Sequence, residues 1–510
     1  MVERKTHGCT NKNFQNFDSL ELETAPPNIL FFISDDQSWK HYSAYGDKAV
    51  KSPAFDQIAR EGVLFNNAYT ACPSCAPSRS AVLTGQHIWR LEEGGVFGCT
   101  LPRKFKTFPV LLEEAGYFSG WTGKGWGSGN LKAGGWGKDS PLGQCYNQKN
   151  INENTKQGLD VLPFDYAANF SQFLRDKPKD KLFFFWCGFG EPHRGYTKGS
   201  GLNSGMKLKD ADLPEHLPDT PEIRSDILDY CREIEYLDSH VARILQTIRD
   251  KGLLDNTMVI ITSDQGMPFP RSKPTLYDVG THIPMAISWP KKIPGGIVVN
   301  DMVSLVDIAP TILEAADVEV PQEMNGKSLM KVLFSKNSGL IDSSRDWIVT
   351  ALERHGPYRQ GGVGYPCRAI QTKRYLYIWN IFPDREPSGK SEDNKYYPTR
   401  NPCPEIDPGP SKDFLIEHQD NPDVKKFAKL AFGKHSAEEL YDKEKDPGQI
   451  NNFVNDPNYS VIKEELSEKL KQYLRQTNDP RLFGDNTFDT YIYDTENWVE
   501  STFGISEFPH

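Results

Sequence analysis

Continuous apolar runs that alternate with helical patterns constrain the fold of this chain more than any other feature. The apolar runs predict buried strands at residues 28–34, 118–122, 182–187, 258–263 and 284–288. Between two of them, residues 223–251 have apolar side chains at helical spacing and are followed by Gly252, a typical helix stop. Strands that are apolar on both faces lie in parallel sheets covered by helices on both sides. The sequence therefore predicts an α/β fold with a large mixed, mostly parallel sheet flanked by helices.

The pattern changes near residue 366. The segments beyond it predict a short antiparallel pair, a stretch of long loops rich in Pro and Asp, and a final amphipathic helix, at residues 368–370 with 375–379, at 383–423 and at 459–474. We therefore expect a catalytic domain at residues 25–365 and a smaller C-terminal α+β subdomain with a short antiparallel sheet at residues 366–510. Residues 1–24 are polar and predict a mobile N-terminal arm.

Composition excludes several classes of protein. With 37% hydrophobic and 25% charged residues, the chain has the balance of a globular protein. Its net charge of −10 argues against nucleic-acid binding, which requires a basic surface. No apolar run approaches the ~18 residues of a transmembrane helix, and residues 1–10 lack the apolar core of a signal peptide. The nine cysteines are scattered and do not form a disulfide framework.

The most informative short motif lies within residues 72–85. It reads Cys75-Ala76-Pro77-Ser78-Arg79 and continues to Leu83-Thr84-Gly85. With Cys72 it also forms a C-x-x-C pair, which is typical of dithiol redox sites and of half a zinc site. A redox pair would require a small thioredoxin-like unit around it. A zinc site would require a second pair at short spacing, and the nearby Cys99 and His87 are not so spaced.

Polar side chains follow four predicted strands at their carboxyl ends, where open α/β sheets bind ligands. They are Asp35-Asp36, Lys124, His193 and Asp264-Gln265. Three carboxylates and an amide oxygen are hard ligands that suit Ca²⁺ or Mg²⁺ better than zinc. Taken alone, Asp35-Asp36 is as typical of a turn or a helix cap as of a metal site. Together with Asp264-Gln265 and the cysteine motif, it favours a metal site.

The cysteine motif and the strand-end residues together resemble the type I sulfatases. In that family the cysteine that Cys75 matches is oxidised after synthesis to formylglycine, an aldehyde whose hydrate attacks sulfur. The resemblance implies an alkaline-phosphatase-like sandwich fold and a formylglycine-generating enzyme as maturation partner. Residues 190–194 and 263–270 are most similar to heparan N-sulfatase-like (sulfamidase-like) members, and residues 439–452 resemble the family's C-terminal stretch. The similarity covers residues 25–475.

The resemblance implies a calcium site. Asp35, Asp36, Asp264 and Gln265 match the family's four metal ligands, and Cys75, as the aldehyde hydrate, would help to complete the shell. Many members have Asn at the fourth position, where this chain has Gln265, which keeps the amide oxygen. Magnesium would suit the same oxygen ligands.

The resemblance also implies catalytic roles. Cys75, as formylglycine hydrate, would be the nucleophile, at the start of a helix whose first amides favour an anion. Arg79 would hold the hydrate or a sulfate oxygen. Lys124 and Lys273 would bind the sulfate and offset the charge that grows in the transition state. His193 would protonate the leaving oxygen or nitrogen.

One position departs from the family. Members usually read Gly-Lys-x-His, with the histidine helping to deprotonate the hydrate, whereas this chain reads Gly123-Lys124-Gly125-Trp126. The indole N–H of Trp126 only donates, so Trp126 cannot act as a base. Either His41 or His282 substitutes, or the expulsion step differs, and Trp126 is then a candidate to line the sugar subsite.

Polar residues near the predicted domain junction are candidate substrate-binding residues. They are Arg354, His355, Arg359 and Arg368. Bidentate arginine contacts would suit a uronate or a second sulfate, and ordinary surface charge is the alternative.

These observations predict a sulfatase that hydrolyses sulfate esters of a sulfated carbohydrate. The alternatives are a sulfamidase that removes N-sulfate from glucosamine, and a phosphoester or phosphonate hydrolase of the same superfamily. The latter would usually have a Thr or Ser nucleophile or a two-metal set rich in Asp and His. A carbohydrate-binding role without catalysis would follow if Cys75 stayed a thiol. A periplasmic or extracellular location is inferred from the substrate class alone.

Overall fold

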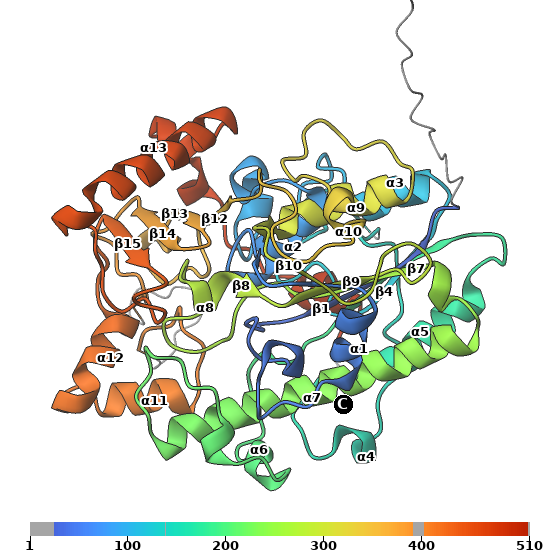
Figure 1. The fold of residues 1–510 in the computed structure, drawn as a ribbon, viewed down its shortest axis with the longest axis horizontal. Coiled ribbons are helices and arrows are strands. Elements are labelled where there is room, and N and C mark those ends of the chain that lie inside the picture. Colours follow the sequence, from blue (N-terminus) through green and yellow to red (C-terminus); the bar gives the residue numbers. More distant parts are fainter. Residues whose placement is uncertain (1–24, 138, 391–401, 508–510) are drawn as a thin grey trace, which may run out of the picture.

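The computed structural model describes residues 25–137, 139–390 and 402–507, so the N-terminal arm expected at residues 1–24 lies outside the described residues. Its main body is a sheet of eight strands between two layers of helices (Figure 1). In spatial order the strands are β10 (Ile297–Val299), β2 (Val63–Phe65), β9 (Met285–Ser288), β7 (Thr257–Ser263), β1 (Asn28–Ser34), β6 (Phe183–Gly188), β4 (Phe118–Gly123) and β5 (Gln144–Cys145).

The central strands of this sheet run parallel and end together. The neighbours β7, β1, β6, β4 and β5 are all parallel, while β9 is antiparallel to both β7 and β2. Ser34 of β1 pairs with Ser263 of β7, and Gly123 of β4 pairs with Gly188 of β6. The mixed, mostly parallel sheet is thus confirmed, and the residues that follow these strands gather at one edge.

Both faces of the sheet are buried, as the unbroken apolar strands predict. In β1, Ile29, Phe31 and Ile33 pack into one core, whereas Leu30 and Phe32 pack into the other. The first face is covered by α2 (Cys75–Thr84), α3 (Phe108–Glu114) and α9 (Ile308–Ala315), and the second by α1 (Pro53–Glu61), α5 (Tyr166–Asp176) and α7 (Pro221–Asp250).

The long helix α7 spans the second face. Its 30 residues correspond to a length of about 45 Å. It begins two residues before the apolar pattern because the Thr220 side chain accepts a hydrogen bond from the Ile223 amide and Pro221 occupies the first turn. The helix predicted at residues 223–251 is therefore confirmed, with a capped start.

A smaller antiparallel sheet lies beside the main body. Its strands are β12 (Trp347–Leu352), β13 (Cys367–Thr372), β14 (Tyr375–Asn380) and β15 (Glu438–Asp442), and α13 (Ser460–Gln476) packs on β13 and β14. The expected antiparallel pair is present as β13 and β14. The sheet takes its first strand, β12, from residues before 366. Long loops are expected at residues 383–423, of which 391–401 lie outside the described residues; the described part also contains α11 (Pro410–Glu417) and the start of α12 (Pro422–Phe432).

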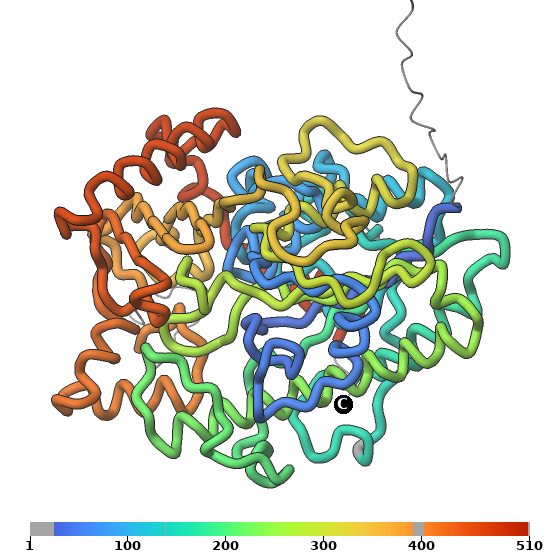
Figure 2. The backbone as a smooth tube through the Cα atoms, in the orientation of Figure 1, coloured from blue at the N-terminus to red at the C-terminus, as the bar shows by residue number. Residues whose placement is uncertain are grey.

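The last described stretch leaves the small sheet and returns to the main body (Figure 2). In α14 (Trp498–Phe503), the Thr502 carbonyl accepts a hydrogen bond from the Gly125 amide at 2.7 Å. The Phe503 carbonyl accepts another from Asn147 Nδ2 at 2.6 Å. This C-terminal segment therefore packs against the loop that follows β4.

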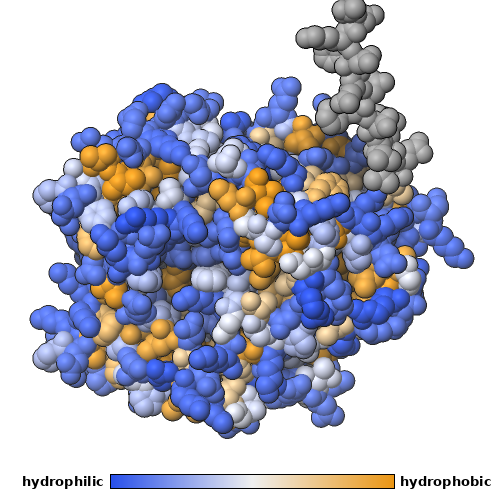
Figure 3. Space-filling view, in the orientation of Figure 1, coloured by the Kyte–Doolittle hydropathy of each residue, from blue (hydrophilic) through white to orange (hydrophobic). Residues whose placement is uncertain are grey.

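No helix in the described part of the chain combines the length and apolar character needed to cross a membrane. The face drawn in Figure 3 is mostly hydrophilic, with apolar patches scattered between charged side chains.

Candidate active site

Carboxylates from two neighbouring strand ends meet at the edge of the main sheet. Asp35 and Asp36 follow β1, and Asp264 follows β7. One oxygen from each lies within 4.8 Å of the others, and all three side chains are buried. The Asp36 amide donates to Asp264 Oδ1 at 3.2 Å, which fixes one strand end to the other. The sheet register therefore brings together the acidic residues that the sequence predicts as metal ligands.

The electrostatics of this cluster fit a divalent cation. Burial, with the charge of Asp35, raises the pKa of Asp264 to about 7, and burial also raises the pKa of Asp36. Burial opposes ionisation of Asp35 too, but Lys124 holds its pKa below the usual range. Close carboxylates repel one another, and a bound cation removes that repulsion. Gln265 Oε1 is buried and has no hydrogen-bond partner among the described residues, so an amide oxygen is available as a fourth ligand.

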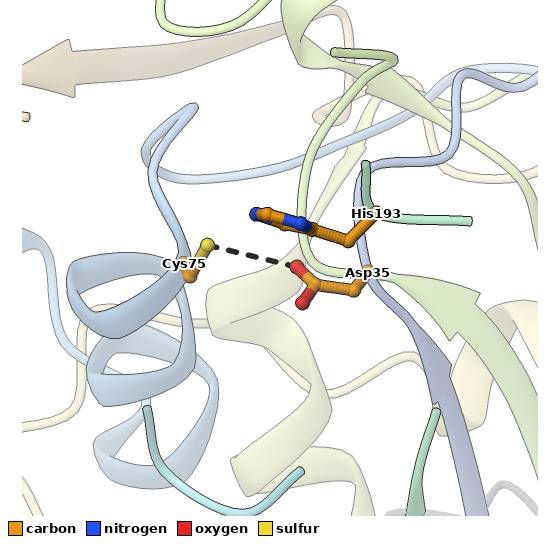
Figure 4. A group of neighbouring side chains, drawn as sticks. All are labelled: Asp35, Cys75 and His193. Carbon is orange, nitrogen blue, oxygen red and sulfur yellow. Dashed lines mark hydrogen bonds between the residues drawn. The ribbon is translucent and has the colours of Figure 1, made fainter. Parts of the chain in front are cut away.

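Cys75 lies against this cluster as the first residue of α2. Its Sγ lies 3.6 Å from Asp35 Oδ1, and Gln265 Nε2 donates to Sγ at 3.1 Å. Figure 4 shows the side chains of Asp35 and His193 extending toward Cys75. The amides of the first helical turn favour an anion here. Burial, and then Asp35, raise the pKa of the Cys75 thiol to about 12, so the unmodified side chain is a neutral thiol at neutral pH.

Two lysines bring positive charge to the carboxylates. Lys124 Nζ forms an ion pair with Asp35, and Lys273 Nζ lies 2.9 Å from Asp36 Oδ2. Lys273 also lies 3.3 Å from Asp407 Oδ2, a carboxylate from the loop before α11. Both lysines line the cavity at Cys75, where an anionic substrate group would meet them.

His193 is the most exposed of the predicted catalytic residues, with 36% of its side chain accessible. Its Nε2 lies 3.7 Å from Asp36 Oδ2, and its Nδ1 lies 2.6 Å from the Arg194 carbonyl. Because a carbonyl only accepts, Nδ1 carries a hydrogen, and Nε2 is the nitrogen that faces the carboxylate cluster.

Arg79 holds two backbone segments of the site together. It is fully buried, its Nε lies 2.8 Å from Asp264 Oδ2, and its Nη1 donates to the carbonyls of Lys124 and Gly125. The guanidinium thus joins the end of β7 to the loop after β4. This places both Asp264 and Lys124.

Comparison with known proteins identifies the family. A model of the sulfatase family matches residues 27–318, which is more than half of the chain. The chain belongs to the sulfatase family. A second model, of the C-terminal part of N-sulphoglucosamine sulphohydrolase, matches residues 271–384, so this sulfatase is sulfamidase-like, as its motifs predict. It is an enzyme that hydrolyses sulfate esters.

Individual relatives align over most of the sulfatase. It is 28% identical to the N-sulphoglucosamine sulphohydrolase of Homo sapiens, over 89% of this chain and 91% of the relative. It is 27% identical to an ulvan-active sulfatase of Formosa agariphila, over 89% of this chain and 81% of the relative. A solved structure described as a complex with its substrate D-glucosamine-2-N,6-O-disulfate has a TM-score of 0.64 at 20% identity, covering 89% of this chain and 98% of that one. The fold is therefore the alkaline-phosphatase-like sandwich that the resemblance implies.

The sulfatase places Trp126 in its interior. The indole is 1% exposed, belongs to the core on the α2 face and donates from Nε1 to Ser80 Oγ at 2.8 Å. It does not line the cavity at Cys75. The two histidines considered as substitutes for the missing base, His41 and His282, do not line this cavity either. His41 Nδ1 pairs with Asp47, and His282 Nδ1 pairs with Asp278.

The three arginines near the predicted domain junction bond to other parts of the fold and do not line the cavity at Cys75. Arg354 donates to the Tyr491 carbonyl, Arg359 pairs with Glu405, and Arg368 pairs with two carboxylates. All three are at most 5% exposed. His355 differs, because it lines the cavity at Cys75 and its Nδ1 lies 2.8 Å from Ser74 Oγ. Burial, then Lys273, lower the pKa of His355 to about 3.

Several cavity residues carry no sequence signal. Asp407, Ser128 and Trp498 line the cavity at Cys75, but they lie in loops or short elements without a motif. Cys72, the other member of the C-x-x-C pair, is buried and forms no disulfide with Cys75.

Proposed function

We propose that this sulfatase hydrolyses sulfate esters of a sulfated carbohydrate, through a formylglycine made from Cys75 and a calcium ion. The position of Cys75 carries the proposal, because its Sγ lies at the helix start, 3.6 Å from a carboxylate of the three-Asp cluster. The relatives support the carbohydrate, since their names refer to sulfated glucosamine and ulvan.

Asp35, Asp36, Asp264 and Gln265 would hold the ion, since they offer hard oxygen ligands at one point. Magnesium could bind the same oxygens. When bound, the ion would polarise a sulfate oxygen as a Lewis acid.

The cysteine requires a formylglycine-generating enzyme as a partner. The aldehyde hydrate supplies one hydroxyl that can attack sulfur and a second that allows sulfate to be expelled. Lys124, Lys273 and the first amides of α2 would stabilise the charge that develops on the sulfate oxygens. His193 would deliver a proton to the leaving atom from Nε2, which lies 3.7 Å from Asp36 Oδ2.

A sulfamidase that removes N-sulfate from glucosamine is the second candidate. The match to the N-sulphoglucosamine sulphohydrolase C-terminal model and the human relative favour it. Either substrate class would place the enzyme in the periplasm or outside the cell.

The test measures sulfate release from a panel of sulfated oligosaccharides, using protein produced together with a formylglycine-generating enzyme. Intact mass establishes the aldehyde, and Cys75→Ala is the matched inactive control. Release from an O-sulfated sugar supports the first candidate, and release only from N-sulfated glucosamine supports the second. No release by protein proven to carry the aldehyde would contradict both and direct the search to phosphate and phosphonate esters.

A further inference from the structure

The cleft at the active site has two adjoining lobes. The first, here the cysteine lobe, is lined by Cys75, Lys273 and His355, and the second, here the acidic lobe, by Asp160, Glu191 and Glu233. Four residues line both lobes and form their border: Lys124, Ser128, His193 and Trp498. Each lobe has a cavity volume of about 420 Å³, which is in the range of small-ligand sites.

The two lobes differ in charge. The cysteine lobe holds the lysines that would bind sulfate. Beyond its border the acidic lobe has four carboxyl groups, from Asp35, which pairs with Lys124, and from Asp160, Glu191 and Glu233. The one cation among its described lining residues there is Arg194. That guanidinium is occupied, since Nη1 and Nη2 donate to the two oxygens of Asp226 at 2.7 and 2.8 Å. A ligand group with a negative charge would find no unpaired cation among the described lining residues beyond the border, so it would be disfavoured in this lobe.

Glu233 gives the acidic lobe an unused hydrogen-bonding group. It lies in the middle of α7, is 1% exposed, and its Oε1 has no partner among the described residues. Its neighbour Glu191 differs, because that carboxylate accepts from the Leu162 amide and the Tyr166 hydroxyl. Buried polar atoms normally have partners, so Glu233 is available to a hydroxyl or amine of a ligand. Burial, then Glu191 and Asp160, raise the pKa of Glu233 well above its usual range.

Trp498 adds an aromatic surface at the border. Its side chain is 38% exposed although it is large and apolar. Its ring meets Phe503 edge-on, with ring centroids 6.1 Å apart. The bond from the Gly125 amide to the Thr502 carbonyl fixes α14 beside Lys124. A sugar ring has apolar C–H faces that can pack on such an indole while its hydroxyls bond to nearby carboxyls.

We propose that the acidic lobe binds the sugar ring from which the sulfate is removed, and selects a ring that carries no second acidic group. The inference rests on the carbohydrate function proposed above. With the sulfate in the cysteine lobe, the leaving atom lies at the border beside His193. The ring then extends over Trp498 toward Glu233. A ring that leaves with a free amine, which is cationic at neutral pH, suits this lobe best.

The test measures binding of three desulfated probes: glucosamine, N-acetylglucosamine and glucuronate. They are titrated by saturation-transfer NMR into the full chain with calcium and saturating inorganic sulfate, which fills the lysine site. We expect glucosamine to bind most tightly, and the dissociation constant of glucuronate to be at least about ten-fold larger than that of glucosamine. Glucuronate that binds as tightly as glucosamine would overturn the proposal.

Variants locate the binding. Trp498→Ala should weaken binding of all three probes about ten-fold, whereas Ile492→Ala, an exposed change in the same segment, should not. Asp160→Lys at the exposed rim should reverse the preference between glucosamine and glucuronate. Glu233→Ala should weaken the binding of glucosamine, whereas the control Glu222→Gln, at the exposed start of α7, should not. If Glu233→Ala does not fold, Trp498→Ala and Asp160→Lys still test the site. Unchanged dissociation constants in Trp498→Ala would refute the site.

The two proposals fail separately. Probe binding does not require a mature Cys75, so intact binding without sulfate release would contradict only the proposed function. Sulfate release without probe binding, or with probe affinities that do not depend on the charge of the probe, would contradict only the acidic-lobe assignment.

Discussion

Asp264 connects three parts of the site through one carboxyl group. Its Oδ1 accepts from the Asp36 amide, its Oδ2 from Arg79, and its oxygens belong to the three-carboxylate cluster. We expect Asp264→Ala to lose bound calcium and to release sulfate at least about 100-fold more slowly. Removing a metal ligand should cost more activity than removing a residue that only hydrogen-bonds to a ligand. Calcium per chain, measured by atomic emission, checks this. Asp342→Ala, away from the cluster, is the control. Unchanged calcium content would exclude Asp264 as a ligand.

His87 predicts how stability changes with pH. It is 3% exposed, stacks on Trp89 at 4.2 Å and lies 2.7 Å through Nε2 from the Tyr473 hydroxyl of α13. Burial, then Arg90, lower its pKa to about 3, against about 6.5 in an unfolded chain. The unfolded state therefore binds the proton first. Stability contributed by His87 is present above about pH 6.5 and is lost as pH falls, by up to about 1.4 kcal/mol per pH unit.

His87→Gln should remove this term, because glutamine does not titrate. We expect the fall in melting temperature between about pH 7.5 and about pH 5 to be smaller in the variant than in the wild type. The exposed His418→Gln is the matched control and should leave the fall unchanged. An identical fall in His87→Gln would show that His87 is not buried neutral.

At the scale of elements, Asn147 secures the end of β4, where Lys124 begins the active-site loop. Its Oδ1 accepts from the Thr122 hydroxyl and the Gly123 amide, and its Nδ2 donates to the Gly123 and Phe503 carbonyls. Asn147→Ala leaves these buried groups unpaired, and we expect it to lower the free energy of unfolding by about 2–4 kcal/mol. Denaturant titration checks the loss, with exposed Asn458→Ala as control. A loss below about 0.5 kcal/mol would mean that water or neighbours replace these bonds.

The same elements show what a sequence can predict. Strands β1, β6 and β7 each contain an unbroken apolar run, so their positions follow from hydrophobicity. Their shared carboxyl edge follows from parallel pairing, which brings Asp35 and Asp264 together. The path of residues 480–507 does not follow, since it depends on single hydrogen bonds such as Gly125 to Thr502 rather than on a periodic pattern. Trp498 in this segment and Asp407 in the loop before α11 therefore have no periodic signal in the sequence. Trp126, the candidate for lining the sugar subsite, instead packs in the core.

At the scale of the whole molecule, a buried ion network joins the small sheet to the chain that returns to the main body. Arg368 in β13 pairs with Glu353, which follows β12, and with Asp479, which follows α13. Arg481 pairs with the same Glu353 at 2.8 Å and with Asp489 at 3.1 Å. The network therefore fixes the point at which the C-terminal segment leaves the small sheet.

Arg368 distinguishes a structural from a substrate-binding role for these arginines. Because its side chain is fully buried, Arg368→Leu should remove one cation from two buried carboxylates, although Glu353 keeps its pair with Arg481, and cost about 3–5 kcal/mol of stability. In protein that remains folded, KM for an anionic sulfated oligosaccharide should stay within about two-fold, since the buried guanidinium does not line the cavity at Cys75. Arg249→Leu, exposed on α7, controls for the loss of one positive charge. The opposite result, an unchanged melting temperature with a raised KM, would return Arg368 to the substrate site and require the small sheet to open during binding.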